Sequence, residues 1–164
     1  MGTKTQREYD SFVNYYIHLV NLMRHLLGES YAVSYADTSG TVMPVHGKSG
    51  VPGTIEMSPY VTTVAWQEEA LIAFERGYIH LTLPAPVASN RPGGVTLYRD
   101  PGSGAVPLEL RPDLPWVHAM RQQAMNFLAA IRGEKTPLCQ APEALEDLQI
   151  ARDYMMKLRG DLKT

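Results

Sequence analysis

The stretch that decides the fold lies near the start of the chain and reads YDSFVNYYIHLVNLMRHLLGE over residues 9–29. Its apolar residues recur every three or four positions, which is the period of an α-helix. These residues are Phe12, Tyr15, Leu19, Leu22 and Leu26. Further apolar residues widen the stripe, so we expect a helix over 9–27 that is buried on most sides. Gly28 suits the end of this helix, because glycine adopts the left-handed conformation at low cost.

The middle of the chain, residues 30–110, favours β-strands. Two apolar runs, 70–74 and 78–83, flank Glu75-Arg76-Gly77 and predict a β-hairpin in which Gly77 takes a positive φ. The run 61–66 is rich in β-branched and aromatic residues, which favour an extended chain. Further strands are expected at 31–35, 53–57 and 95–99.

The end of the chain is helical again. An apolar face recurs at helical spacing from Trp116 to Ile131, and Gly133 follows as a helix end. A second helix is expected over 143–158, with Pro142 suited to its first turn. Because helix, strands and helices follow one another as separate runs, the sequence predicts an α+β fold. We expect a large, open, mostly antiparallel sheet with helices packed on one face.

Length and composition indicate a single globular domain. The chain has 164 residues, of which 45% are hydrophobic and 20% are charged. We expect residues 9–164 to form this domain. Residues 1–8 are polar, and we expect them to be a disordered leader or an addition to the natural sequence.

Charge and hydropathy exclude several classes of protein. A net charge of -2 offers no basic surface for nucleic acid. No apolar run reaches the roughly 20 residues that a membrane span needs, and the N-terminus lacks an apolar signal-peptide core. The single cysteine, Cys139, excludes an internal disulfide, and we expect its thiol to be buried and inert. The sequence therefore predicts a cytoplasmic protein.

The first helix also carries a row of uncharged polar residues. Asn14, His18, Asn21 and His25 lie four, three and four positions apart, so they share one side of the helix. Buried polar groups need hydrogen-bond partners, and this row would find them either within the protein or in a polar ligand. A histidine in such a site can move a proton near neutral pH, and an amide can orient a hydroxyl. The pattern alone leaves both interpretations open.

Metal and nucleotide motifs are not found in the sequence. His18 and His25 lie about 10 Å apart along the helix axis, which is too far to share one ion. The segment His46-Gly47-Lys48-Ser49-Gly50 lacks the spacing of a phosphate loop, and no GxGxxG occurs. We therefore expect neither a metal site nor a cofactor-binding residue in this chain.

Three segments together resemble the Gfo/Idh/MocA oxidoreductases, the family of glucose-fructose oxidoreductase and inositol dehydrogenase. HLVNLMRHLLGE (18–29) is similar to the catalytic helix of that family, which opens with an Asp-x-x-x-His pair. WQEEALIAFERGYIHLTLP (66–84) looks like its sheet hairpin. FLAAIRGEKTPLCQAPEALEDLQIAR (127–152) looks like its closing helix pair. The resemblance covers most of residues 9–160 and implies the C-terminal domain of such an enzyme.

The resemblance implies a substrate site on the first helix. His18 matches the active-site histidine of the family, which lies beside the hydroxyl being oxidised. Asn14 stands where the family has an aspartate, and an amide can bind a hydroxyl but cannot act as a carboxylate base. Asn21, on the same side of the helix, is expected to bind the substrate as well.

The cofactor and the partners follow from the same resemblance. The family holds NAD or NADP, and its catalytic lysine, in an N-terminal Rossmann domain that is absent from this chain. The implied reaction is hydride transfer between NAD(P) and a sugar, a polyol or a related carbohydrate, and the chain alone is expected to be inactive. The implied assembly is a homo-oligomer formed through the sheet face, to which Trp66, Ile72 and Phe74 are expected to contribute.

A second interpretation is a non-catalytic binding or oligomerisation module that retains the same fold. Asn14 in place of an aspartate favours this interpretation, and so does the lack of a cofactor-binding motif. The sequence therefore leaves open whether the protein is an enzyme.

Overall fold

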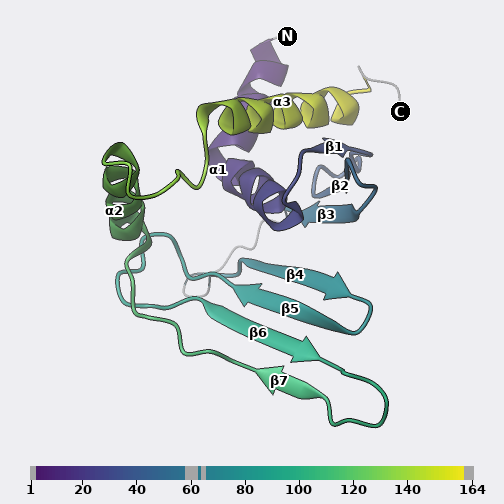
Figure 1. Cartoon of the computed structure of the whole chain (residues 1–164). Coiled ribbons are helices and arrows are strands. Elements are labelled where there is room, and N and C mark those ends of the chain that lie inside the picture. The colour runs from purple at the N-terminus through teal and green to yellow at the C-terminus, as the bar shows by residue number, and fades with distance from the viewer. Residues whose placement is uncertain (1–2, 58–62, 64–65, 161–164) are drawn as a thin grey trace. The chain divides into compact units, whose positions relative to one another are not determined.

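The computed structural model describes residues 3–57, 63 and 66–160, and the chain divides into two compact units (Figure 1). The first unit comprises Met1–Pro59 and Leu138–Thr164, and the second comprises Tyr60–Pro137. Each unit combines helical and antiparallel strand segments, which confirms the predicted α+β class. The described strands form a three-stranded and a four-stranded sheet, where one large sheet was expected.

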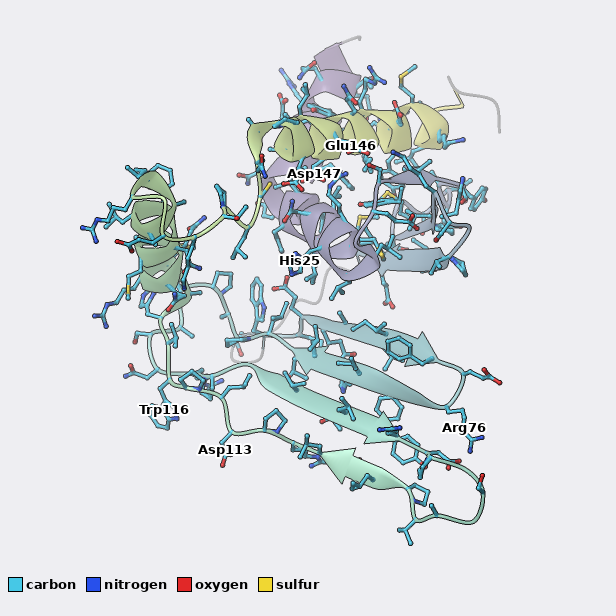
Figure 2. All side chains as sticks on the ribbon, in the orientation of Figure 1. His25, Arg76, Asp113, Trp116, Glu146 and Asp147 are labelled. Carbon is cyan, nitrogen blue, oxygen red and sulfur yellow. The ribbon has the colours of Figure 1, made fainter. Side chains whose placement is uncertain are left out.

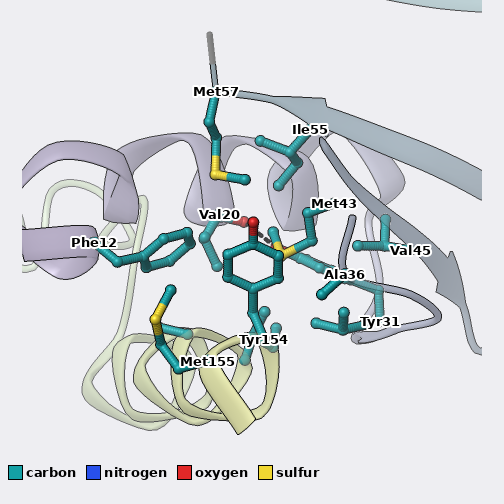
Figure 3. Close-up of a cluster of buried hydrophobic side chains, with 13 residues drawn as sticks. Phe12, Val20, Tyr31, Ala36, Met43, Val45, Ile55, Met57, Tyr154 and Met155 are labelled. Carbon is teal, nitrogen blue, oxygen red and sulfur yellow. Dashed lines mark hydrogen bonds between the residues drawn. The ribbon is translucent and has the colours of Figure 1, made fainter. Parts of the chain in front are cut away.

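The first unit packs two helices and a small sheet around one core. Its elements are α1 (Thr3–Leu27), β1 (Tyr31–Val33), β2 (Val42–Gly47), β3 (Pro52–Glu56) and α3 (Ala141–Leu158). The strands pair in the order β1-β2-β3, and both helices contribute apolar side chains to the core that Figure 3 shows. Val20, Met43 and Tyr154 are almost completely buried there.

Helix α1 begins at Thr3, about one and two-thirds turns before the predicted start at Tyr9. Residues 3–8 are therefore helical, where the sequence analysis expected a disordered leader or an addition to the natural sequence. Gln6 donates a hydrogen bond of 2.8 Å to Asp10 one turn later, and Glu8 forms an ion pair with Arg159. The ion pair joins residues far apart in the sequence, so apolar periodicity could not reveal it.

Strand β2 is absent from the predicted set, and Pro44 at its centre is unusual for a central strand. The Pro44 carbonyl accepts the backbone N–H of Ser34 at 2.9 Å, but its own nitrogen cannot donate a hydrogen bond in return. Strand β1 accordingly ends at Val33, short of the predicted range 31–35.

The turn between β2 and β3 is held by Glu29. Its carboxylate accepts hydrogen bonds from the Ser49 backbone N–H at 3.1 Å and from the Ser49 hydroxyl at 2.5 Å. A Cβ at position 47 would meet the Glu29 carboxylate, so a larger residue there would push that side chain out of its contacts with Ser49. The donors of Ser49 in this turn are therefore bound by a carboxylate of the same chain.

The second unit contains the predicted hairpin. Strands β4 (Glu69–Phe74) and β5 (Gly77–Thr82) pair antiparallel, with Phe74 opposite Gly77. Gly77 is not among the glycines with positive φ, so that part of the prediction is wrong. The position requires glycine for a different reason, because a Cβ would overlap the backbone of Tyr98 on the next strand.

Strands β6 (Gly94–Arg99) and β7 (Leu108–Leu110) complete a sheet with the order β4-β5-β6-β7. Side chains alternate along the strands, which gives one mixed and one apolar face. On the mixed face Tyr78 stacks on Tyr98 with ring centroids 5.4 Å apart. We call the other side the apolar face; its residues are Ala70, Ile72, Phe74, Ile79, Leu81, Val95, Leu97, Leu108 and Leu110. The predicted strand 61–66 lies largely outside the described residues.

Both C-terminal helices are confirmed. Helix α2 (Ala119–Ile131) ends before Gly133, which has a φ of 72°. Helix α3 begins with a capping box in which Gln140 and Glu143 each bond the other's backbone, and Pro142 lies in its first turn. Helix α2 contains no buried residue, and Phe127 is 66% exposed, so its apolar stripe is not part of a core.

Tyr154 carries the buried hydroxyl whose removal should stabilise the first unit. The side chain is 1% exposed, and its hydroxyl has no hydrogen-bond partner among the described residues. An unpaired buried polar group costs about 1–3 kcal/mol, so Tyr154→Phe is expected to raise the free energy of unfolding by about 1 kcal/mol. Urea denaturation followed by circular dichroism measures this change. The matched control is Tyr31→Phe, since the Tyr31 hydroxyl donates a hydrogen bond of 2.8 Å to the Val20 carbonyl.

The same substitution should also change the response to alkaline pH. Burial raises the pKa of Tyr154 from 10.0 to about 12. The unfolded tyrosine ionises first, so the stability that the neutral ring contributes is complete below pH 10.0 and is lost as the pH rises towards 12. Tyr154→Phe should therefore reduce the fall in stability over this range. An unchanged alkaline profile together with a destabilised variant would show that the hydroxyl has a partner.

Candidate active site on helix α1

Helix α1 separates a buried side from an exposed polar side. Phe12, Val20 and Arg24 are buried against the rest of the first unit. Asn14 and His18 are exposed, and they lie four positions apart. One helical turn therefore separates them, with a rise of about 6 Å along the axis. The helix fixes their spacing, while its buried side fixes the direction in which they face.

Arg24 anchors the buried side of α1 to α3. Its guanidinium binds the Asp147 carboxylate through Nε at 2.9 Å and Nη2 at 2.5 Å, and Nη1 lies 2.5 Å from Glu146. Burial lowers the pKa of Arg24, but the hydrogen bonds and charges of Asp147 and Glu146 outweigh it, so the pKa is raised overall. Figure 2 shows both acidic residues on α3, facing α1. Ser30 completes the cluster with a hydrogen bond of 3.0 Å to Glu146.

Asn21 belongs to this anchor as well. Its Nδ2 amide donates hydrogen bonds to Asp147 at 2.7 Å and to Cys139 at 3.3 Å. Asn21 lies three positions before Arg24, at the edge of the polar row nearest α3, and is half-buried. The structure therefore separates it from the exposed pair Asn14 and His18, and its engaged amide does not favour the substrate role predicted for it.

Cys139 is exposed, so the prediction of a buried thiol is wrong. It lies in the loop just before Gln140, the N-cap of α3. Its sulfur accepts the Asn21 amide, and its S–H donates to the Gln140 carbonyl at 3.7 Å. The thiol therefore takes part in the junction between α1 and α3 while remaining open to solvent.

His25 continues the exposed row about two turns beyond His18. It is exposed, and it lies in the last turn of α1, where a cation is favoured by the helix dipole. No described group of three or more His, Cys, Asp or Glu side chains is arranged to hold a metal ion. The described helices also include none with the length and hydropathy to cross a membrane.

Sequence reasoning missed the anchor, although the sequence carries a signal for it. Asp147 lies at helical spacing from Ile150, Ala151 and Tyr154, which are all buried. A charge within an apolar stripe must find a partner, because burying an unpaired carboxylate costs several kcal/mol. The signal therefore predicts a buried cation without telling which of the arginines supplies it.

Two solved structures resemble this chain in fold. One is a protein named as an NADPH-dependent oxidoreductase from Desulfitobacterium hafniense, with a TM-score of 0.66 and 11% identity over 92% of this chain and 46% of its own. The other is the aldose-aldose oxidoreductase from Caulobacter crescentus complexed with glycerol, with a TM-score of 0.59 and 16% identity over 89% of this chain and 44% of its own. This chain thus spans less than half the length of either protein. Neither the protein-family models nor the curated proteins give a match. At these identities the likeness shows a shared fold, one that oxidoreductases use.

Proposed function

We propose that this chain is the substrate-side C-terminal domain of an NAD(P)-dependent oxidoreductase of the Gfo/Idh/MocA type, acting on a sugar, a polyol or a related carbohydrate. The observation that carries the proposal is the exposed pair Asn14 and His18, one turn apart on an anchored helix. The oxidoreductase fold of the two neighbours supports the reaction class. The name of the aldose-aldose oxidoreductase supports a carbohydrate substrate.

The roles of the two side chains follow from their chemistry. Oxidation of an alcohol removes a hydride from carbon and a proton from the hydroxyl, so the hydroxyl needs a proton acceptor. His18 can accept that proton through a ring nitrogen. Asn14 can hold the same hydroxyl or its neighbour with its amide, since side chains four residues apart on a helix are adjacent. Because Asn14 carries no charge, His18 is the group that we assign to proton transfer.

The anchor explains how the pair is presented. Asn21 and Arg24 of α1 both bind Asp147, so the helix cannot rotate about its axis without breaking buried polar contacts. A fixed rotation of the helix keeps Asn14 and His18 on the open side. We assign Asn21 to this positioning role rather than to direct contact with the substrate.

The nicotinamide cofactor fits a domain other than this one. Dinucleotides bind at a glycine-rich turn between a parallel strand and a helix, whereas every strand pair among the described residues is antiparallel. A nicotinamide ring supplied by a Rossmann domain would accept the hydride. In that arrangement the residues of this chain bind and orient the alcohol and take up its proton.

The chain alone is therefore expected not to bind the cofactor. Calorimetric titration with NAD(H) or NADP(H) should show no affinity tighter than millimolar, because the sequence has no GxGxxG turn to bind the pyrophosphate. ATP, titrated in parallel, controls for unspecific phosphate binding. Micromolar affinity for either nicotinamide nucleotide, with none for ATP, would contradict the proposal that a separate domain binds the cofactor.

We also propose that the chain forms a homo-oligomer through the four-stranded sheet. Phe74, Leu108 and Leu110 on the apolar face are 60%, 60% and 58% exposed. Contiguous apolar surface of this kind marks an interaction site in a folded protein. The same surface favours the second candidate, a non-catalytic oligomerisation module. Turnover by the intact protein, and its loss when His18 is replaced, distinguishes the enzyme from the module.

A further inference from the structure

Tyr15 is the one exposed aromatic side chain of helix α1 among the residues of the helix that the structure describes. It is 63% exposed, whereas the other exposed side chains of this helix are polar or charged. Tyr15 follows Asn14 directly and lies three positions before His18, so the side chains of Tyr15 and Asn14 both neighbour that of His18 on the helix surface. An open aromatic ring therefore borders the pair to which we assign the substrate hydroxyl.

A row of rings connects Tyr15 to the core of the first unit. Tyr154 and Phe12, which Figure 3 shows in that core, have ring centroids 5.1 Å apart, and Phe12 in turn lies 5.8 Å from Tyr16. The rings of Tyr16 and Tyr15 lie 6.4 Å apart and are tilted by 53°. The Tyr16 hydroxyl donates a hydrogen bond of 3.2 Å to the Met57 carbonyl, which holds this ring in place. Tyr15 is therefore supported on one side, while most of its surface faces solvent.

An aromatic ring next to an amide and an imidazole suits a closed sugar ring. The carbon-bound hydrogens on the face of a pyranose carry a small positive charge, and the face of an aromatic ring is negative, so the two attract each other while apolar surface is buried. The hydroxyls of the same sugar lie around its edge, where the Asn14 amide and the His18 imidazole can bond them.

The spacing on the helix also fits one such ring. Side chains three or four positions apart on a helix have Cβ atoms about 5–6 Å apart, which is comparable to the width of a pyranose. Asn14, Tyr15 and His18 can therefore all contact the same sugar unit. An open-chain polyol offers the hydroxyls but presents no continuous C–H face to the tyrosine ring.

We propose that Tyr15 is the residue of the substrate site on which the sugar ring stacks, and that the substrate is a closed pyranose rather than an open-chain polyol. The inference rests on the proposed function and narrows its substrate class. Stacking fixes the plane of the sugar, and the hydrogen bonds of Asn14 and His18 then determine which hydroxyl at its edge lies beside the imidazole. Because the Tyr15 ring is already supported by Tyr16, little side-chain freedom is lost on binding.

NMR titration of the chain with two small carbohydrates tests the inference. Methyl β-glucopyranoside is locked in its ring form, and sorbitol is an open-chain polyol. The glucoside should shift the ring resonances of Tyr15 and His18. Tyr15→Ala should weaken its binding by about 10-fold, as the loss of a ring contact does, and should leave sorbitol binding unchanged. Tyr15→Phe keeps the ring and removes the hydroxyl, so it should bind the glucoside as the parent does.

Tyr35→Ala is the matched control, because Tyr35 is 48% exposed and lies in the loop after β1, and it should leave glucoside binding unchanged. Equal affinity of Tyr15→Ala and the parent for the glucoside would contradict the stacking and leave the proposed function standing. A loss in Tyr15→Phe as large as that in Tyr15→Ala would do the same. If neither carbohydrate shifts the His18 resonances, the carbohydrate site on α1 is contradicted, and the proposed function with it. Circular dichroism of each variant checks that it folds.

Discussion

In the oxidoreductase that we propose, replacement of His18 by glutamine is expected to lower kcat by about 100- to 10,000-fold, which is the usual effect of losing a general base. Glutamine keeps a polar side chain of similar reach, but it cannot take up a proton from the alcohol. Because His18 is exposed on α1, the substitution removes no core contact. The thermal transition of the variant should therefore match that of the parent. The measurement is steady-state turnover with the alcohol substrate and the nicotinamide cofactor.

The matched control is His25→Gln. His25 is also exposed on α1, but it lies seven positions further along, about 10 Å from His18 on the axis. It should keep turnover within a small factor of the parent. Full turnover by His18→Gln would show that His18 is not the proton acceptor, and equal losses in both variants would point to a general effect on the helix. Unfolding of His18→Gln would favour a structural histidine instead.

The elements that the sequence predicts well are those whose signals are local. The apolar stripe of α1, Gly28 at its end with φ of 69°, and the hairpin around Glu75-Arg76 all follow from residues close together in the chain. The place of Pro142 in the first turn of α3 is equally local. These features need no knowledge of the fold, because helix periods, caps and tight turns depend on neighbouring residues alone.

The features that escaped prediction depend on contacts between distant segments. The early start of α1 depends on the pair Glu8 and Arg159, and the strand containing Pro44 is stabilised by pairing on both of its edges. The exposed state of Cys139 follows from the place of its loop, which its own neighbours do not encode. Tertiary pairing overrides local preference in each case.

The same distinction between local signals and distant contacts applies to the residues of the candidate site. The spacing of Asn14 and His18 predicts that they share a face, and both are exposed in the structure. Asn21 shares the same helical side by spacing. Its amide nevertheless donates a hydrogen bond to the Asp147 carboxylate, more than a hundred residues away in the sequence. Helical geometry fixes which residues are adjacent, whereas the partner that each one meets depends on the packing of α3. The catalytic and binding roles themselves stay predictions.

Removal of the Asp147 carboxylate is expected to have a large effect on stability. Asp147→Ala is expected to lower the free energy of unfolding of the first unit by about 3–5 kcal/mol, because it leaves Arg24 as a buried charge without its main partner. Asp147 is 2% exposed and Arg24 is 8% exposed, so water cannot replace the lost contacts at little cost. The Asn21 amide loses its acceptor in the same variant. Urea denaturation followed by circular dichroism measures the change.

Asp153 provides the control on the same helix. It pairs with Arg152 at 2.7 Å, but the two side chains are 53% (Arg152) and 41% (Asp153) exposed, so Asp153→Ala should cost less than about 1 kcal/mol. The double variant Arg24→Met with Asp147→Leu should recover most of the stability lost in Asp147→Ala, since apolar residues of similar size can replace a buried ion pair. If Asp147→Ala cost no more than Asp153→Ala, the carboxylate would not anchor α1. The positioning that we assign to this anchor depends on that difference, because a helix held only by apolar contacts could rotate and turn His18 away from the substrate.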